Sequence, residues 1–406
     1  LAYDDFIRQQ IAGDELNPGD EAANTATRFC LSGPDMPDIN LLAERRHTLL
    51  NEMVATIGES ILGLQVGCAQ CHDHPHDAIS QADFYRLRAI FEPAVQLQRN
   101  KSVTVLSQQR PFTKPSRLMI RGDFHRPGPI VTADIPRVLK QSDQSLGQDQ
   151  DSSARALFAH WLVSRDNPLT ARVIANRVWQ HHFGVGLVDT PNEFGVLGAE
   201  PTHPDLLDWL AGSLMDNDWS LKRLHRTIVT SATYRQRSYL SPSASHEERI
   251  AWARALATDE DGALLSRFPR RRLSGESIRD AMLTAAGQLN EEMDGPGVRP
   301  PLPKELVRTL LPNQWNVTED ADQHTRRSIY LFARRNLRYP FLHVFDRPSA
   351  NSSCGRRDIT TTAPQSLHLL NSQFTLTMAR RMSESIAGDD SDRQTQIQTV
   401  FRRVLG

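Results

Sequence analysis

Two cysteines and a histidine stand at a spacing that could attach a cofactor covalently. The segment Cys68–His72 reads Cys-Ala-Gln-Cys-His. Thiols three residues apart lie on one turn, so each can add to a vinyl group of a haem, and the adjoining imidazole can then bind the iron. Two of the four cysteines of the chain are found in this segment. The pattern therefore predicts covalently bound haem c, with Cys68, Cys71 and His72 as the cofactor-binding residues.

Two more histidines follow at once and leave a metal site open as an alternative. His74 and His76 add imidazoles, and any two of His72, His74 and His76 could join the two thiols in a tetrahedral zinc site. Zinc fingers separate their two ligand pairs by about a dozen residues, whereas these ligands are nearly contiguous. Haem is the favoured hypothesis, zinc or another metal the second, and a plain disulfide between the two cysteines the third.

The second axial ligand of a haem iron is not evident from the sequence. Its candidates are His47, Met53, Met119 and His125, and each such residue is more commonly a packed or solvated side chain. An iron without a sixth protein ligand would favour ligand chemistry over pure electron transfer.

Helices are predicted on both sides of this cluster, because apolar residues recur at helical spacing. The stretch 40–64 places them on one broad stripe, and a short helix follows around 84–91. Proline-punctuated residues between about 98 and 135 predict short strands at 103–106 and 117–122. Further helices are predicted at 154–164, from 167, at 204–215, 221–231, from 274 and at 364–382, with one strand at 328–333.

A polar segment, 138–153, predicts a linker between two domains. The predicted domains are residues 1–137 and 154–406. The first domain reads as incomplete at its N-terminus and the second as incomplete at its C-terminus, as in a piece of a longer protein.

Composition excludes two broad classes of protein. The 406 residues are 39% hydrophobic and 23% charged, which suits folded domains. Forty-seven basic and 48 acidic residues give a formal net charge of −1, so the basic excess of a general nucleic-acid binder is missing. No apolar run approaches the roughly 18–20 residues of a membrane helix. We therefore expect no nucleic-acid partner and no membrane span in this chain.

Polar side chains of the second half could build further sites. One set could line a pocket: Asn176, Arg177, Trp179, His181, His182 and Glu193. A second set could clamp an anion: Asp346, Cys354, Arg356 and Arg357. Cys354 is expected to be buried or bonded to Cys30. No single one of these residues is identified as catalytic.

Motifs over nearly the whole chain resemble two families that occur together: a planctomycete cytochrome-c-like domain, followed by a planctomycete-specific domain of unknown function. The motifs are Ile61–His74, Asp83–Tyr85, Asn176–Trp179, Pro191–Gly195, Pro201–Leu210, Ser231–Gln236, Leu273–Asp280, Phe345–Ser349 and Thr362–Asn371. One departure is Pro75-His76, where the first family usually has lysine and an aromatic residue. The extra imidazole strengthens the metal alternative.

The resemblance implies a mainly α fold, with a cytochrome-c-like helical region and a short β segment before a larger, mostly helical domain. It also implies an exported or periplasmic c-type haem protein with a redox or electron-transfer role. Its partner would be a redox protein or another cytochrome domain, and the second domain could serve an oxidoreductase reaction, with a carbohydrate as the suggested substrate. The alternatives are a non-redox zinc protein or hydrolase and a cell-surface binding scaffold. Whether the chain is an enzyme stays open.

Overall fold

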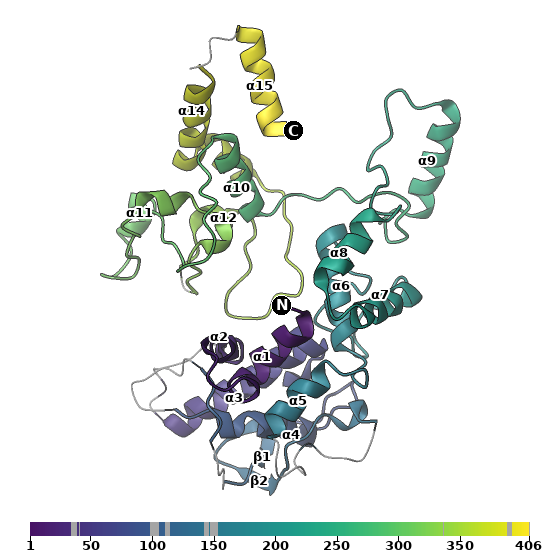
Figure 1. Ribbon diagram of the computed structural model, residues 1–406, viewed down its shortest axis with the longest axis vertical. Helices are drawn as coiled ribbons and strands as arrows, with labels where there is room; N and C mark the ends of the chain where they lie inside the picture. Colours follow the sequence, from purple (N-terminus) through teal and green to yellow (C-terminus); the bar gives the residue numbers. More distant parts are fainter. Residues whose placement is uncertain are drawn as a thin grey trace. The chain divides into compact units, whose positions relative to one another are not determined.

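The computed structural model describes residues 1–33, 39, 41–97, 105–109, 114–141, 146, 153–335, 337–387 and 392–405. The chain divides into two compact units, Leu1–Arg270 and Arg271–Gly406. Helices dominate both units, and the described residues form one two-stranded sheet (Figure 1). The prediction of a mainly α fold is therefore confirmed.

The first unit contains nine α-helices and both strands among its described residues. Its elements are α1 (Tyr3–Leu16), α2 (Glu21–Ala26), α3 (Leu42–Ile57), α4 (Gln81–Phe91), β1 (Arg117–Met119), β2 (Pro127–Ile130), α5 (Ala154–Leu162), α6 (Thr170–Phe183), α7 (Pro204–Asp216), α8 (Leu221–Thr230) and α9 (His246–Thr258). The helices predicted at 154–164, 204–215 and 221–231 are confirmed by α5, α7 and α8.

The apolar stripe predicted at 40–64 forms the buried face of α3 and of the turn that follows it. Leu50, Met53, Val54 and Ile57 of this helix are at most 2% exposed. A π-helical turn, η2 (Gly58–Leu62), then ends at Gly63 in a left-handed conformation, with φ 62°. The chain leaves the core here and begins the short helix η3 (Val66–Gln70), which includes the first cysteine of the cluster.

Helix α4 begins where its sequence provides a cap. The Ser80 hydroxyl accepts the backbone N–H of Asp83, and the Asp83 carboxylate accepts the backbone N–H of Ser80, which together form a capping box. Phe84, Leu87 and Ile90 are buried in the same core as α3. The cap and the core contacts therefore fix the position of α4, which follows the Cys/His cluster in the chain.

Strands β1 and β2 form an antiparallel pair, with Arg117 opposite Ile130 and Met119 opposite Pro127. The strand predicted at 117–122 is confirmed for its first three residues, after which Arg121 and Gly122 take positive φ values of 55° and 75°. The pairing of β2 was not predicted, because prolines usually mark turns. Part of the strand predicted at 103–106 falls outside the described residues, and Leu106 lies in no strand.

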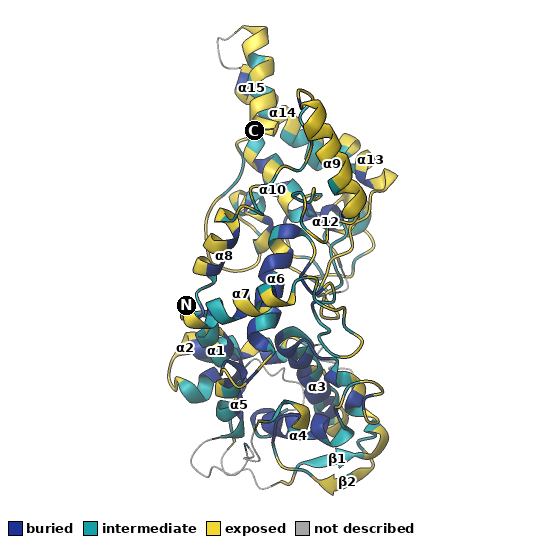
Figure 2. Cartoon of the chain, turned by 90° about the vertical axis from the view of Figure 1, so that its right-hand side faces the viewer, coloured by how far each residue is buried: buried dark blue, intermediate teal, exposed yellow. Residues whose placement is uncertain are grey.

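The second unit contains six α-helices among its described residues. They are α10 (Gly275–Ala285), α11 (Lys304–Val307), α12 (Pro340–Val344), α13 (Ala363–Asn371), α14 (Gln373–Ala387) and α15 (Arg393–Leu405). The helix predicted at 364–382 is confirmed as two helices, α13 and α14. Figure 2 shows buried residues concentrated in α3, α4 and α6 of the first unit, while α9 and α15 are mostly exposed.

The strand predicted at 328–333 is wrong. Ser328–Tyr330 forms a single 3-10 turn, and only an isolated bridge joins Leu331 to Val298. The hydroxyl and the backbone N–H of Ser328 both bond the Asp280 carboxylate, which holds the segment against α10 instead of beside another strand.

The predicted division into residues 1–137, a linker at 138–153 and residues 154–406 stays a prediction, because most of 138–153 lies outside the described residues. Along the chain, the boundary between the two compact units falls between Arg270 and Arg271. Among the described residues, no helix has both the length and the apolar character needed to cross a membrane.

Candidate functional site

The cysteines of the cluster lie on a short helix whose other side is buried. Val66 and Ala69 of η3 are at most 1% exposed and anchor the turn in the core. Cys68 and Cys71 are both exposed, and both are free thiols. The two predicted haem-attaching residues therefore stand on one turn with their thiols accessible.

Polar contacts from α4 fix the backbone of this turn. The carbonyl oxygen of Gln70 accepts hydrogen bonds from Gln81 Nε2 at 3.0 Å and from the Tyr85 hydroxyl at 3.1 Å. The Asp73 carboxylate accepts the backbone N–H of Gln81 at 2.7 Å. The cluster therefore has exposed reactive groups on a backbone that hydrogen bonds from α4 keep in place.

His72 is exposed, and one of its ring nitrogens is already oriented. Its Nδ1 lies 2.6 Å from the backbone oxygen of Asp73. A carbonyl oxygen can only accept, so Nδ1 must donate and the neutral ring has its lone pair on Nε2. Metal-ligating histidines commonly use this arrangement, in which one nitrogen binds a carbonyl and the other the metal. Nε2 is therefore the ring nitrogen of His72 that has a lone pair available for a ligand.

His74 has the opposite tautomer, with its proton on the other ring nitrogen. It is buried, and its Nδ1 accepts backbone N–H groups from Asp77 at 2.8 Å and from His76 at 3.3 Å. The proton of the neutral ring is therefore on Nε2, and neither nitrogen offers a lone pair to a metal. A zinc site would have to use His72 and His76 instead.

Across the described part of the chain, no group of three or more His, Cys, Asp or Glu side chains is arranged to hold a metal ion. The assignment of His72, His74 and His76 as metal ligands stays a prediction.

Two carboxyl groups meet beside His74, an arrangement that the sequence alone did not indicate. Asp77 Oδ1 accepts the backbone N–H of Val196 at 2.7 Å, whereas its Oδ2 is buried and has no hydrogen-bond partner among the described residues. Glu193 accepts the N–H of Gly195 at 2.8 Å. Burial raises the pKa of Glu193, and the nearby Asp77 raises it further. The segment after the cluster is thus bound to the loop around residues 193–196.

The candidates for a sixth iron ligand differ in their surroundings. Met53 is buried in the core. The ring nitrogens of His47 lie 2.9 Å from Asn51 Nδ2 and 2.9 Å from Arg88 Nη1. Burial, together with the charge of Arg88, lowers the pKa of His47 to about 4. His47 is therefore a neutral, bonded core residue.

Met119 is the last residue of β1, and His125 lies on the segment that follows this strand. A methyl group built on Gly122 would come within 2.7 Å of Cys71 Sγ, so this segment passes directly against the second thiol. His125 is exposed and its ring lies 3.8 Å from that of Phe124. Met119 faces a cavity. The segment thus joins the cluster to that cavity.

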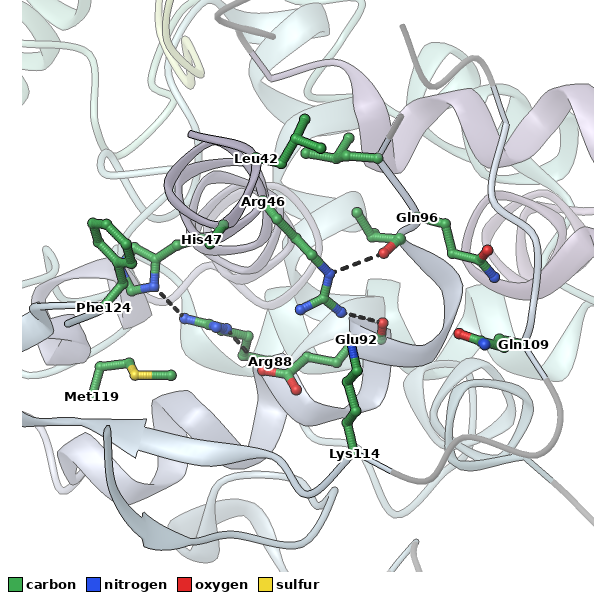
Figure 3. Close-up of a pocket in the computed structure, with 13 residues that line it drawn as sticks. Leu42, Arg46, His47, Arg88, Glu92, Gln96, Gln109, Lys114, Met119 and Phe124 are labelled. Atoms are coloured by element: carbon green, nitrogen blue, oxygen red, sulfur yellow. Dashed lines mark hydrogen bonds and ion pairs between the residues drawn. The ribbon is translucent and has the colours of Figure 1, made fainter. Parts of the chain in front are cut away.

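The cavity has a volume of about 540 Å³ and lies between α3, α4 and the segment after β1 (Figure 3). Its lining residues are Leu42, Ala43, Arg46, His47, Arg88, Glu92, Val95, Gln96, Leu97, Gln109, Lys114, Met119 and Phe124. The cysteines and His72 are not among them. The cavity is therefore a neighbour of the cluster and not its binding pocket.

Two of the residues expected to line a pocket around α6, Asn176 and Arg177, hold the backbone of neighbouring segments. Asn176 bonds both the N–H and the carbonyl of Val188, each at 2.9 Å. Arg177 donates to the carbonyl oxygens of Glu59, Ser60 and Pro191. These side chains therefore fix η2 and the 188–191 loop.

In the second unit, the expected anion clamp is already paired within the chain. Asp346 accepts hydrogen bonds from Arg272 and Thr360, and Arg357 binds Glu276 at 2.8 Å. The expectation that Cys354 is buried or bonded to Cys30 is wrong, because Cys354 is exposed and both cysteines are free. Cys30 is the buried one, and burial raises the pKa of its thiol to about 12.

Comparison with family models accounts for most of the chain. Residues 154–406 match PSD1, described as a protein of unknown function (DUF1553). The chain belongs to the DUF1553 family. Residues 1–96 match PSCyt2, described as a protein of unknown function (DUF1549), so the two families follow one another in the expected order. No curated protein and no solved structure matches the chain.

The contact between Asp77 and Val196 joins the two family regions of the chain. Asp77 lies in the part similar to DUF1549, whereas Val196 and Glu193 lie in the DUF1553 region. Both belong to the same compact unit. The DUF1553 region therefore contributes directly to the surroundings of the Cys/His cluster.

Proposed function

We propose that this DUF1553-family chain is an exported c-type haem protein with a redox or electron-transfer role. Cys68 and Cys71 would form the thioether bonds, and His72 would be the axial ligand. The observation that supports this most is the orientation of His72. Its Nδ1 is bound to a backbone carbonyl, and Nε2 is exposed beside two accessible free thiols.

The residues present fit such a group. Both thiols are accessible, so each can add across a vinyl group, with its sulfur bonded to carbon and its proton passed to the neighbouring carbon. Bound haem would supply reversible one-electron transfer. The contacts from Gln81 and Tyr85 to the Gln70 carbonyl would keep the attachment turn in place.

The zinc alternative finds less support in the same contacts. Its ligands would be the two thiols with His72 and His76, since backbone N–H groups occupy Nδ1 of His74. A zinc-bound thiolate or hydrolytic site is therefore the second candidate, and it becomes an outcome of the test below.

The wider part of the proposal concerns partners. A haem attached at an exposed turn could exchange electrons with a redox protein or with another cytochrome domain, because short distances to the surface favour transfer. The DUF1553 region would then recognise the substrate that this redox reaction serves, for which a carbohydrate is the sequence-based hypothesis. The setting would be the periplasm or the cell exterior.

The test is haem attachment in matched variants. The chain is expressed with an export signal in a host that matures c-type cytochromes, and haem-stained gels are compared for the parent, Cys71→Ser and Cys354→Ser. We expect strong covalent haem staining in the parent and in Cys354→Ser, and weaker staining in Cys71→Ser, because only one thioether bond can form there. Equal staining of all three, or a colourless parent that contains one zinc ion per chain, would overturn the proposal.

A further inference from the structure

The cavity beside α3 and α4 has an excess of positive charge. Arg46, Arg88 and Lys114 line it, and Glu92 is the one acidic residue among its described lining residues. His47 adds no positive charge, since it is neutral at pH 7. Three cationic side chains therefore face one carboxylate in a partly buried space, where unbalanced charge is costly.

The single carboxylate is already fully engaged. Glu92 Oε1 accepts Arg88 Nε at 3.2 Å, and its Oε2 accepts the hydroxyl of Ser116 at 2.8 Å. Arg88 is only 3% exposed and cannot reach bulk solvent freely. Glu92 balances the charge of Arg88, whereas Arg46 has no carboxylate partner among the described residues.

Both arginines keep N–H donors that no other described residue accepts. Arg46 donates through Nε to Val95 O at 3.0 Å and through Nη2 to the backbone oxygen of Glu92. Arg88 donates through Nε and Nη1. Within the described part of the chain, Arg46 Nη1 and Arg88 Nη2 have no hydrogen-bond partner. Neither atom is fully buried. They therefore open onto the cavity.

The two guanidinium groups are close enough to affect each other. Burial lowers the pKa of Arg46, the charge of Glu92 opposes this, and the charge of Arg88 lowers the pKa further. Figure 3 shows both groups extending into the same space, with Lys114 beside them. A guanidinium matches the geometry of carboxylate, sulfate and phosphate oxygens, so a ligand oxygen group placed here would receive donors from two sides.

Apolar side chains form a further part of the wall, beside the polar Gln96 and Gln109. Leu42, Val95, Leu97, Met119 and Phe124 line the cavity together with the cations. A volume of about 540 Å³ suits a small organic molecule. The wall therefore favours an anion that also has an apolar part over a simple inorganic ion.

We propose that this cavity binds a small organic molecule through an anionic oxygen group, held between the guanidinium groups of Arg46 and Arg88, with the apolar part of the molecule against Phe124 and Met119. The inference does not depend on haem, because neither cysteine nor His72 lines the cavity.

The test is calorimetric titration of the whole chain with four ligands that share one ring. Benzoate, phenyl sulfate and phenyl phosphate differ in their anionic group, and benzamide is the neutral counterpart of benzoate. We expect at least one anion to bind, with an affinity that falls as salt is added, and benzamide to bind at least about tenfold more weakly. The order of the three anions identifies the preferred oxygen group.

Matched variants locate the binding. Arg46→Gln should weaken the best anion about tenfold, and the exposed Lys114→Gln about threefold. Arg172→Gln removes a surface arginine that pairs with Asp208 on a different face, and should change nothing. If Arg46→Gln fails to fold by circular dichroism, Lys114→Gln and the salt dependence decide. Benzamide binding as tightly as benzoate, equal losses in Arg172→Gln, or no binding by any anion would overturn the proposal.

Discussion

Two segments of the sequence contain several reactive residue types, and the surroundings of these residues differ between the two segments. Around Cys68–Asp77 the backbone is bonded to α4, while the thiols and His72 Nε2 stay accessible. Around residues 346–357 of the second unit, Asp346 and Arg357 are paired within the chain. A cluster of reactive residue types therefore becomes a candidate site only where the fold fixes the backbone and leaves the reactive atoms unpaired.

The largest effect is expected where the backbone passes closest to a thiol. Gly122→Ala would place a methyl group 2.7 Å from Cys71 Sγ at a residue with φ +75°. We expect this to lower the free energy of unfolding by about 3 kcal/mol, from strain and overpacking together. Urea denaturation measures it.

The matched control for that change is Gly19→Ala. Gly19 has φ +88° but nothing within 4 Å of its added methyl group. It should cost only about 1 kcal/mol, from backbone strain alone. Equal costs at the two glycines would show that Cys71 is not packed against residue 122.

The next effect tests whether the second segment is indeed held by its pairs. Asp346→Ala removes the partner of Arg272 and of Thr360, and should cost about 2 kcal/mol of unfolding free energy. The exposed Asp358→Ala in the same segment should cost almost nothing. A negligible cost at residue 346 would mean that its ion pair does not hold the segment.

A pH effect of similar size is expected beside the cluster. Burial lowers the pKa of His47 from 6.5 to about 4, so between these values the unfolded chain binds a proton that the folded chain does not. Stability should therefore be full above pH 6.5 and fall by about 2 kcal/mol as the pH decreases to 4, after allowance for solvent screening. His47→Gln should flatten this slope in pH-dependent denaturation, while the exposed His246→Gln should leave it unchanged.

The smallest effect concerns a single bond to the attachment turn. Tyr85→Phe removes the hydroxyl that donates to Gln70 O at 3.1 Å, while Gln81 keeps the carbonyl paired. We expect a loss of about 1 kcal/mol, against none for Tyr239→Phe, which is 64% exposed. Thermal unfolding of the two variants decides whether α4 holds the turn through this bond.

Much of the fold could be predicted because its signals are local. The stripe of α3 and the Ser220 cap of α8 both depend on residues within a few positions of each other. Helix α9 has the same kind of signal, a capping box of Ser245 and Glu248, and could have been found from it.

The errors arose where distant parts of the chain decide the structure. Ser328 bonds Asp280, which lies far away in sequence, and β2 pairs in spite of its prolines. The same distinction between local and distant signals applies to the candidate site. Spacing alone indicated the thiols and His72, whereas the opposite states of His72 and His74 depend on backbone groups that only the folded turn brings to each ring.

We propose that the Cys68–Cys71 turn binds haem covalently, and the mass of the peptide that contains this turn tests the proposal. Protein exported from a host that matures c-type cytochromes is digested, and the peptide containing both cysteines is weighed alongside the visible spectrum of the intact chain. The account predicts one haem adduct on this peptide and a Soret band. Unmodified thiols in a colourless, folded protein would contradict it.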